Sequence, residues 1–119
     1  MKTDNVIEVK SKSLAIRVVK LCRHLQNEKK EFVLTKQLLR SGTSIGANVK
    51  EALRGQSRAD FISKMNIALK EASETEYWLE ILNETEYLTD IEFNSIYADN
   101  KEVLKILMSI VKTSREEQL

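Results

Sequence analysis

Apolar residues recur at helical spacing along most of the chain. In the first segment, Leu14, Val18, Leu21 and Leu25 are separated by four, three and four residues, which places them on one face of a helix. The polar run NEKKE then interrupts the pattern. The spacing therefore predicts a first helix over about residues 11–28.

A second helix is expected over 34–54, and its core-facing row is unusual because it includes polar residues. Gly55 comes directly after this segment, where a glycine commonly ends a helix. The row advances by four and three residues in turn through Leu34, Leu38, Ser41, Ile45, Asn48 and Ala52.

A third helix is expected over 58–84. Ser57 and Asp60 have the three-residue spacing of a capping box at its start, with aspartate in place of the usual glutamate. Its apolar row keeps a heptad rhythm through Phe61, Met65, Ala68, Ala72, Thr75, Leu79 and Leu82.

A fourth helix is expected over 90–113, because Thr89 and Glu92 form a Thr-x-x-Glu capping box at its start. The polar residues 114–119 are expected to fray. This helix has two adjacent apolar rows, one of Phe93, Ile96, Asn100, Val103, Leu107 and Ile110 and the other of Tyr97, Leu104, Met108 and Val111.

Length and composition agree with an all-α fold. The chain has 119 residues, no proline and only three glycines, so it offers few of the turns that short strands require. Four helices of about 20 residues joined by short connections form an up-down-up-down bundle. We therefore predict a single four-helix-bundle domain over residues 1–119.

The doubled row on the fourth helix is wider than one bundle core needs, and the third helix has a similar surplus that includes Ile62 and Leu69. Part of this surface can cover the corners of the bundle. The rest is expected to form a contact between copies of the chain. The residues expected in that contact are Tyr77, Trp78, Ile81, Tyr97, Leu104 and Met108.

The stretch SGTSIGANVKEA, residues 41–52, contains two of the three glycines. A phosphate-binding loop needs G-x-x-x-x-G-K-S/T after a strand. Here Gly42 and Gly46 are only four residues apart, and Ala47 and Asn48 stand where lysine and serine or threonine would be required. The stretch is therefore interpreted as helix and not as a nucleotide-binding loop.

Within a helix, small residues one turn apart allow another helix to come close. Two glycines inside a helix cost about 1 kcal/mol each relative to alanine, so a close contact must offset them. The partner is either another helix of the bundle or a helix of another subunit. The residues expected at this contact are Ser41, Gly42, Ile45, Gly46 and Asn48.

Residues suited to catalysis or metal binding are sparse, with one histidine and one cysteine in the chain. His24 does not follow a glutamate at the Glu-x-x-His spacing of di-iron bundles, and Cys22 points to a different side of the same helix. We interpret Cys22 as a core residue and His24 as a surface residue. The sequence predicts no metal site, no cofactor and no enzymatic activity.

The location of the protein is predicted from segments that the sequence lacks. No apolar run approaches the roughly 18 residues of a membrane span, and the N-terminal run MKTDNVIEVKSK has no hydrophobic signal core. A single cysteine rules out an internal disulfide framework. We therefore expect a cytoplasmic protein without a membrane partner.

Polar residues beside the apolar rows of the second and third helices are expected to pair with one another. A buried amide or carboxylate without a partner costs about 1–3 kcal/mol. Such a network either fixes the register of the helices or contacts a ligand, unless the groups simply face solvent. The candidates are Arg40, Ser44, Asn48, Glu51, Glu71 and Glu74.

The net charge of +1 conceals a polarity between the two halves of the chain. Residues 1–64 contain 14 Lys/Arg and 6 Asp/Glu, whereas residues 65–119 contain 5 and 12. The basic half either neutralises the acidic half within one molecule, meets the acidic surface of another copy, or binds structured RNA or DNA through phosphate contacts. Candidate phosphate contacts are Arg17, Lys20, Arg23, Lys36, Arg40, Lys50, Arg54 and Arg58.

Two blocks of the sequence are distinctive, KKEFVLTKQLLRSGTSIGANVKEA at 29–52 and SRADFISKMNIALKEASETEYWLEIL at 57–82. With them the chain resembles, from about Val6 to Val111, the bacterial four-helix-bundle family also known as 23S rRNA-intervening-sequence proteins. The resemblance implies a left-handed up-down-up-down bundle and a ring-shaped homopentamer. The positions that match the family pattern are read as structural, and they are Arg40, Ser44, Asn48, Glu51 and Glu74.

The chain is also similar to the accessory variability proteins of diversity-generating retroelements. Those proteins are pentameric, strongly basic, and bind nucleic acid and a reverse transcriptase. This chain departs from them in its nearly neutral overall charge. The sequence therefore favours a homo-oligomeric interaction scaffold, with binding of structured nucleic acid by the basic half as the alternative.

Overall fold

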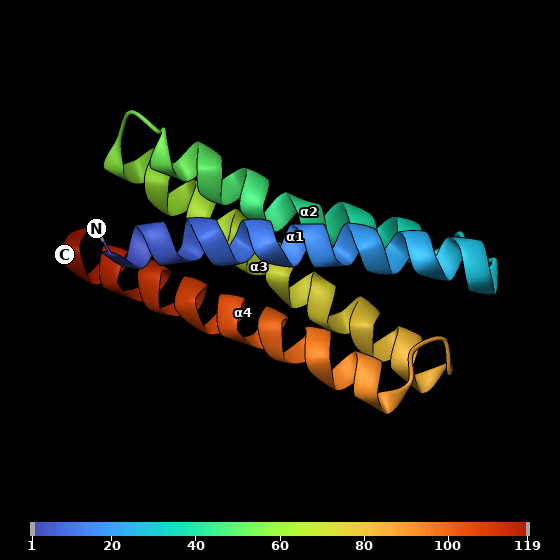
Figure 1. Cartoon of the computed structure of the whole chain (residues 1–119). Helices are drawn as coiled ribbons and strands as arrows, with labels where there is room; N and C mark the ends of the chain where they lie inside the picture. The colour runs from blue at the N-terminus through green and yellow to red at the C-terminus, as the bar shows by residue number, and fades with distance from the viewer. Residues whose placement is uncertain (1, 119) are drawn as a thin grey trace.

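The computed structural model of the chain describes residues 2–118, with side chains for 6–117, and it is an all-α bundle of four sequentially packed, antiparallel helices (Figure 1). The described part measures 48 × 21 × 20 Å. The predicted fold class is confirmed. The helices are α1 at Lys2–Lys29, α2 at Leu34–Leu53, α3 at Arg58–Glu84 and α4 at Asp90–Gln118.

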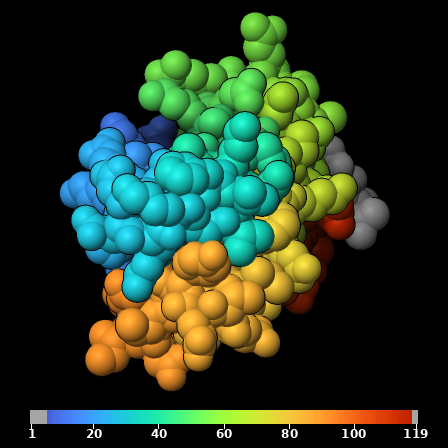
Figure 2. Space-filling view, turned by 90° about the vertical axis from the view of Figure 1, so that its right-hand side faces the viewer, coloured from blue at the N-terminus to red at the C-terminus, as the bar shows by residue number. Residues whose placement is uncertain are grey.

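The four helices form a square in which each one packs against two neighbours. α2 packs against α1 and α3, and α4 packs against α3 and α1, whereas among the described residues no Cα atoms of a diagonal pair lie within 8 Å of each other. The α2–α3 connection lies at the same end as the two chain termini, and the α1–α2 and α3–α4 connections lie together at the other end (Figures 1 and 2). Surfaces suited to binding are therefore the four long grooves and the two ends.

The first helix begins earlier than its predicted start near Ser11. It begins at Lys2, and both Ile7 and Ser11 are buried in the core. Ile7, Ser11 and Leu14 continue the alternating four-and-three spacing toward the N-terminus. The sequence concealed this because a serine occupies a core position between two apolar residues.

The last helix also extends beyond its prediction, so the expectation that residues 114–119 fray is wrong for the part of this segment that the structure describes. α4 continues through 114–118, Ser114 is buried, and Glu117 forms an ion pair with Arg58 at the start of α3. Leu119 lies outside the described residues. The added turn packs against the α2–α3 end of the bundle.

The start of α2 is fixed by a buried carboxylate that sequence inspection did not identify. Glu31 Oε1 accepts hydrogen bonds from the backbone N–H groups of Val33 and Leu34 at 3.1 and 2.8 Å, and Oε2 accepts one from Thr35 at 2.8 Å. Burial acts to raise the pKa of Glu31, but the backbone donors together hold that pKa below its usual value. The carboxylate satisfies N–H groups that have no partner within the helix.

The starts of α3 and α4 have the predicted serine and threonine caps, and the reciprocal bond of a full capping box is found at α4. Ser57 Oγ accepts from the Asp60 N–H at 3.0 Å. Thr89 Oγ1 accepts from the Glu92 N–H at 3.2 Å, and Glu92 Oε1 accepts from the Thr89 N–H at 2.9 Å. Gly55 has no left-handed φ, so α2 ends without the glycine cap that its position suggested.

Polar residues enter the core between α2, α3 and α4. The hydroxyl oxygens of Ser41 and Thr75 lie 3.0 Å apart across the α2–α3 contact. Asn100 Nδ2 donates to the backbone carbonyl of Ala72 at 3.1 Å, while its buried Oδ1 has no partner. Such groups restrict which register of the helices satisfies every donor, because a slip leaves them unpaired in an apolar core.

The two glycines of α2 face α1. A Cβ at Gly42 would lie 2.8 Å from both γ carbons of Val18, and a Cβ at Gly46 would lie 3.4 Å from the carbonyl oxygen of Ser11. The neighbour is thus another helix of the same chain. Ser41 and Ile45 are fully buried beside this contact, whereas Asn48 is only half-buried and Val49 occupies the core instead.

Replacing Gly42 with alanine is expected to destabilise the bundle, although alanine is favoured in helices. The new methyl group would collide with Val18, a buried β-branched side chain that has little rotamer freedom. We expect urea unfolding of Gly42→Ala to show a loss of about 1–3 kcal/mol in the free energy of unfolding.

Gly46→Ala is the matched control, because its methyl group would meet Ser11 only at ordinary contact distance. Its unfolding free energy should stay equal or rise by up to about 1 kcal/mol. Val18→Ala should cost less in the Gly42→Ala background than in the unchanged chain. Equal losses for the two glycine variants would contradict this account of the contact.

Candidate interaction surfaces

A cluster of charged groups ties α2 to α3 on one long face of the bundle. The guanidinium group of Arg40 pairs with Glu71 at 3.4 Å and with the carboxylate of Glu74. The same Glu74 Oε2 accepts a hydrogen bond from Trp78 Nε1 at 3.0 Å. Glu74 therefore holds both an arginine of α2 and the indole of α3 in fixed positions.

The other predicted members of the polar network do not join this cluster. Ser44 Oγ donates to the backbone carbonyl of Arg40 at 2.6 Å, and Asn48 Nδ2 donates to that of Ser44 at 2.8 Å, so both stay within α2. Glu51 is exposed and lies 3.9 Å from Lys64. The predicted set divides into an interhelical ion cluster, two local bonds along α2, and a separate ion pair between Glu51 and Lys64 of α3.

Glu74 has a perturbed pKa because of the groups that it accepts from. The hydrogen bond from Trp78 and the ion pair with Arg40 together lower the pKa of Glu74, against a smaller opposing effect of burial. The carboxylate is therefore ionised over the neutral range. This favours a cluster that positions side chains over one that exchanges protons near neutral pH.

Of the residues predicted for a contact between copies, Trp78 and Ile81 on α3 form part of one continuous row. Ile67, Glu71, Glu74, Trp78 and Ile81 are spaced by four, three, four and three residues along the side of α3 that adjoins α2. Tyr77 lies next to this row, 54% exposed, and its ring meets that of Trp78 edge-on at 5.1 Å. Aromatic and aliphatic surface is thus available to a partner beside α2.

The residues predicted on α4 mostly cover the corner between α3 and α4. The hydroxyl of Tyr97 lies 3.2 Å from carboxylate oxygens of both Glu76 and Glu80, and its ring packs against Phe93 at 4.7 Å. Burial and these carboxylates raise the pKa of Tyr97 to about 12. Leu104 packs against the core, so Met108, 53% exposed, is the member of the predicted α4 set that remains open.

Several predicted phosphate contacts are already paired with carboxylates of the acidic half. Arg17 lies 2.6 Å from Asp99, and Arg58 pairs with Glu117. Arg40 is held by α3, as described above. A phosphate group would have to compete with these carboxylates for the same cations.

The remaining predicted cations have no such partner. Among the side chains that the structure describes, no carboxylate oxygen lies within 4.0 Å of the charged groups of these five residues. They are Lys20, Arg23, Lys36, Lys50 and Arg54.

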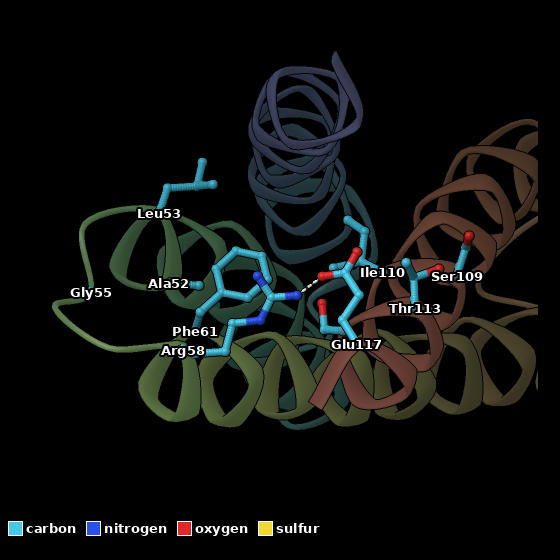
Figure 3. Close-up of a pocket in the computed structure, with 10 residues that line it drawn as sticks. Ala52, Leu53, Gly55, Arg58, Phe61, Ser109, Ile110, Thr113 and Glu117 are labelled. Carbon is cyan, nitrogen blue, oxygen red and sulfur yellow. Dashed lines mark ion pairs between the residues drawn. The ribbon is translucent and has the colours of Figure 1, made fainter. Parts of the chain in front are cut away.

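A cavity of about 350 Å³ lies at the end of the bundle where α2 stops and α3 starts (Figure 3). Phe61 forms an apolar wall, Ser109 and Thr113 contribute hydroxyl groups, and the Arg58–Glu117 ion pair crosses the space between α3 and α4. Neither hydroxyl has a base beside it among the lining residues, because the one lining carboxylate is held by Arg58. The cavity therefore offers space without an evident nucleophile.

The single cysteine and histidine lie where the sequence predicted them. Cys22 is buried, its thiol donates to the backbone carbonyl of Thr35 at 3.4 Å, and burial raises its pKa to about 12. His24 is exposed on α1. Over the described side chains there is no cluster of three or more histidine, cysteine or acidic residues able to hold a metal ion, and no helix there is long and apolar enough to span a membrane.

Comparisons with known proteins agree on one family. The model of the 23S rRNA-intervening sequence protein family matches residues 3–109. The chain is 60% identical to a protein of unknown function from the S23 ribosomal protein family of Bacteroides thetaiotaomicron, whose crystal structure superposes with a TM-score of 0.91 over 92% of this chain and 98% of that one. No protein with a curated description shows significant similarity to the chain.

The single tryptophan makes protonation of Glu74 directly observable. Because the pKa of Glu74 is lowered, its pairing contributes fully above the usual value of 4.5 and is lost as the pH falls through the lower folded-state value. We expect Trp78 fluorescence to change with a midpoint below 4.5.

Two variants test the assignment of this transition. Glu74→Gln should abolish it, and Arg40→Ala should move its midpoint upward because one of the groups lowering the pKa is lost. Circular dichroism over the same pH range separates this local event from unfolding. A transition that persists unchanged in Glu74→Gln would show that another group controls the indole.

Proposed function

Because the chain belongs to the 23S rRNA-intervening sequence protein family, we propose that it is a non-enzymatic helical scaffold that assembles with copies of itself. The observation that carries this proposal is the apolar surface left open on α3 and α4. Tyr77 and Met108 are each more than half exposed, and Ile67 is 38% exposed. Isolated apolar side chains are ordinary on a protein surface, but Tyr77 adjoins Trp78 and Met108 lines a groove with Leu69.

The apolar residues belong to two different surfaces. Ile67, Trp78 and Ile81 lie on the row of α3 beside α2, as the pairing of Glu74 with Arg40 shows. Met108 lies with Leu69 in a groove between α3 and α4. A contact that joins two different surfaces is heterologous, and repeated head to tail it produces a ring or an open filament.

The square arrangement of the helices favours a ring. Neighbouring grooves of a four-helix bundle face directions that differ by roughly 90°. Copies joined through two such faces turn by a similar angle at each contact, which approaches closure after about four or five subunits. This geometry is consistent with the pentameric ring that the family resemblance implies.

Charge contributes less to this proposal than the sequence suggested. Lys10 pairs with Glu102 at 2.6 Å, and Arg17 and Arg58 also hold carboxylates of the acidic half within the same molecule. Much of the polarity between the halves is therefore neutralised internally. The proposed contact between copies depends mainly on apolar surface.

We expect sedimentation velocity at micromolar concentration to give a species several times the 13.7 kDa of one chain. Replacing Tyr77 and Met108 together with serine should shift this species toward the monomer, because both surfaces lose exposed apolar area. Ile91→Ser is the matched control, since Ile91 is 84% exposed at the start of α4, outside both surfaces. A clean monomer for the unchanged chain would refute the proposal.

A further inference from the structure

The groove between α1 and α2 differs from the others in charge. It has a volume of about 620 Å³, and Lys12 of α1 and Lys50 and Arg54 of α2 line its edges. None of these three cations has a carboxylate oxygen within 4.0 Å among the described side chains. Glu8 is the one carboxylate that lines this groove.

The same two rows continue the basic charge toward the other end of the bundle. Arg23 lies eleven residues after Lys12, and Lys36 lies fourteen residues before Lys50, so each falls on the row of its counterpart. Neither has an ion-pair partner among the side chains that the structure describes. Cations therefore line both sides of the groove, and the same rows carry further unpaired cations beyond it.

Aliphatic side chains accompany these cations. Val9 is 64% exposed and Ile16, seven residues later on the same row of α1, is 48% exposed. Between the two helices the groove is lined by Ala15, Gly46 and Ala47, which leave it open to another backbone. Aliphatic contacts do not stabilise the binding of a phosphate group. They do stabilise the binding of a helix that has an apolar face.

We propose that the α1–α2 groove docks an acidic amphipathic helix of a partner protein. An apolar row on that helix would lie over Ala15, Ala47 and the exposed aliphatic residues, and carboxylates on either side would meet the unpaired cations. On α2 the residues that line the groove run from Thr43 to Arg54, about 16 Å at 1.5 Å per residue, which accommodates about three helical turns. This surface is separate from the α3 and α4 surfaces assigned to self-assembly.

The docking can be tested with a synthetic peptide of about 20 residues, designed as a helix with leucine and alanine on one face and glutamate on the others. Fluorescence anisotropy of the labelled peptide, titrated with the full chain, should show saturable binding. A peptide with lysine in place of every glutamate should not bind. Reversing Lys12, Lys50 and Arg54 to glutamate should weaken binding at least about tenfold.

A charge-matched variant controls for the change in overall charge. Reversing Lys29, Lys30 and Lys105, which are exposed and line neither this groove nor the one beside Met108, alters the net charge by the same amount and should leave binding within about twofold. Equal weakening by the two triple variants would overturn the proposal, because binding would then follow net charge and not the groove. Absence of peptide binding by the unchanged chain at low salt would also overturn it.

Ala47→Arg separates a protein helix from a nucleic acid as the occupant. The variant adds a cation while filling the groove, so it should abolish binding of the peptide but strengthen binding of a duplex RNA or DNA. The double variant Val9→Ser, Ile16→Ser should weaken binding of the peptide and leave binding of the duplex unchanged. The surface would be assigned to nucleic acid if Ala47→Arg tightened binding of the duplex and left binding of the peptide unchanged.

Sedimentation of the same variants separates this inference from the proposed self-assembly. The Lys12, Lys50 and Arg54 triple variant should keep the sedimentation coefficient of the unchanged chain. Its conversion to a monomer would mean that the occupant of the groove is a second copy, which would overturn the assignment to another protein. A chain that is monomeric but binds the peptide would leave the docking surface intact and remove only the self-assembly proposal.

Discussion

The close approach of α1 to α2 determines which side chains the bundle presents on its surface. Gly42 has no room for a side chain because Val18 fills the space, and Gly46 lies against the backbone of Ser11. Bringing the helices this close leaves the outer side of their contact lined by small residues, which is the origin of the open groove. On its opposite side, α2 is free to extend Arg40 toward α3. One packing contact thus separates a basic groove from an ion-paired, partly aromatic face.

The distribution of ion pairs determines which charged side chains remain available on the surface. A net charge of +1 suggests a protein with no preference for charged partners. However, Lys10, Arg17 and Arg58 are paired with carboxylates more than 50 residues away in the sequence, so the acidic half neutralises one part of the basic half and leaves another part unpaired. Three of the unpaired cations, Lys12, Lys50 and Arg54, line the α1–α2 groove. Local surface charge, and not net charge, is therefore the electrostatic quantity that a charged partner would encounter.

The sequence predicted the helices well because a spacing of three and four residues is a local property that each segment carries by itself. It also predicted that small residues of α2 meet another helix. It did not predict the buried Glu31, whose role depends on the exact path of a connection, or the early start of α1, where Ser11 interrupts the apolar row. It misplaced Asn48, because a one-residue difference in helix rotation decides whether that residue or Val49 enters the core.

The candidate surfaces were less predictable than the fold, for a physical reason. Whether an arginine is available to a partner depends on which carboxylate packs beside it, and the pairs of Arg17 and Arg58 join segments that only the folded bundle brings together. The same holds for apolar residues. Tyr97 and Met108 belong to one row of α4, yet Tyr97 is taken up by Glu76 and Glu80 of α3 while Met108 stays open. Sequence spacing identifies a row, and packing between rows decides which of its members remain free for another molecule.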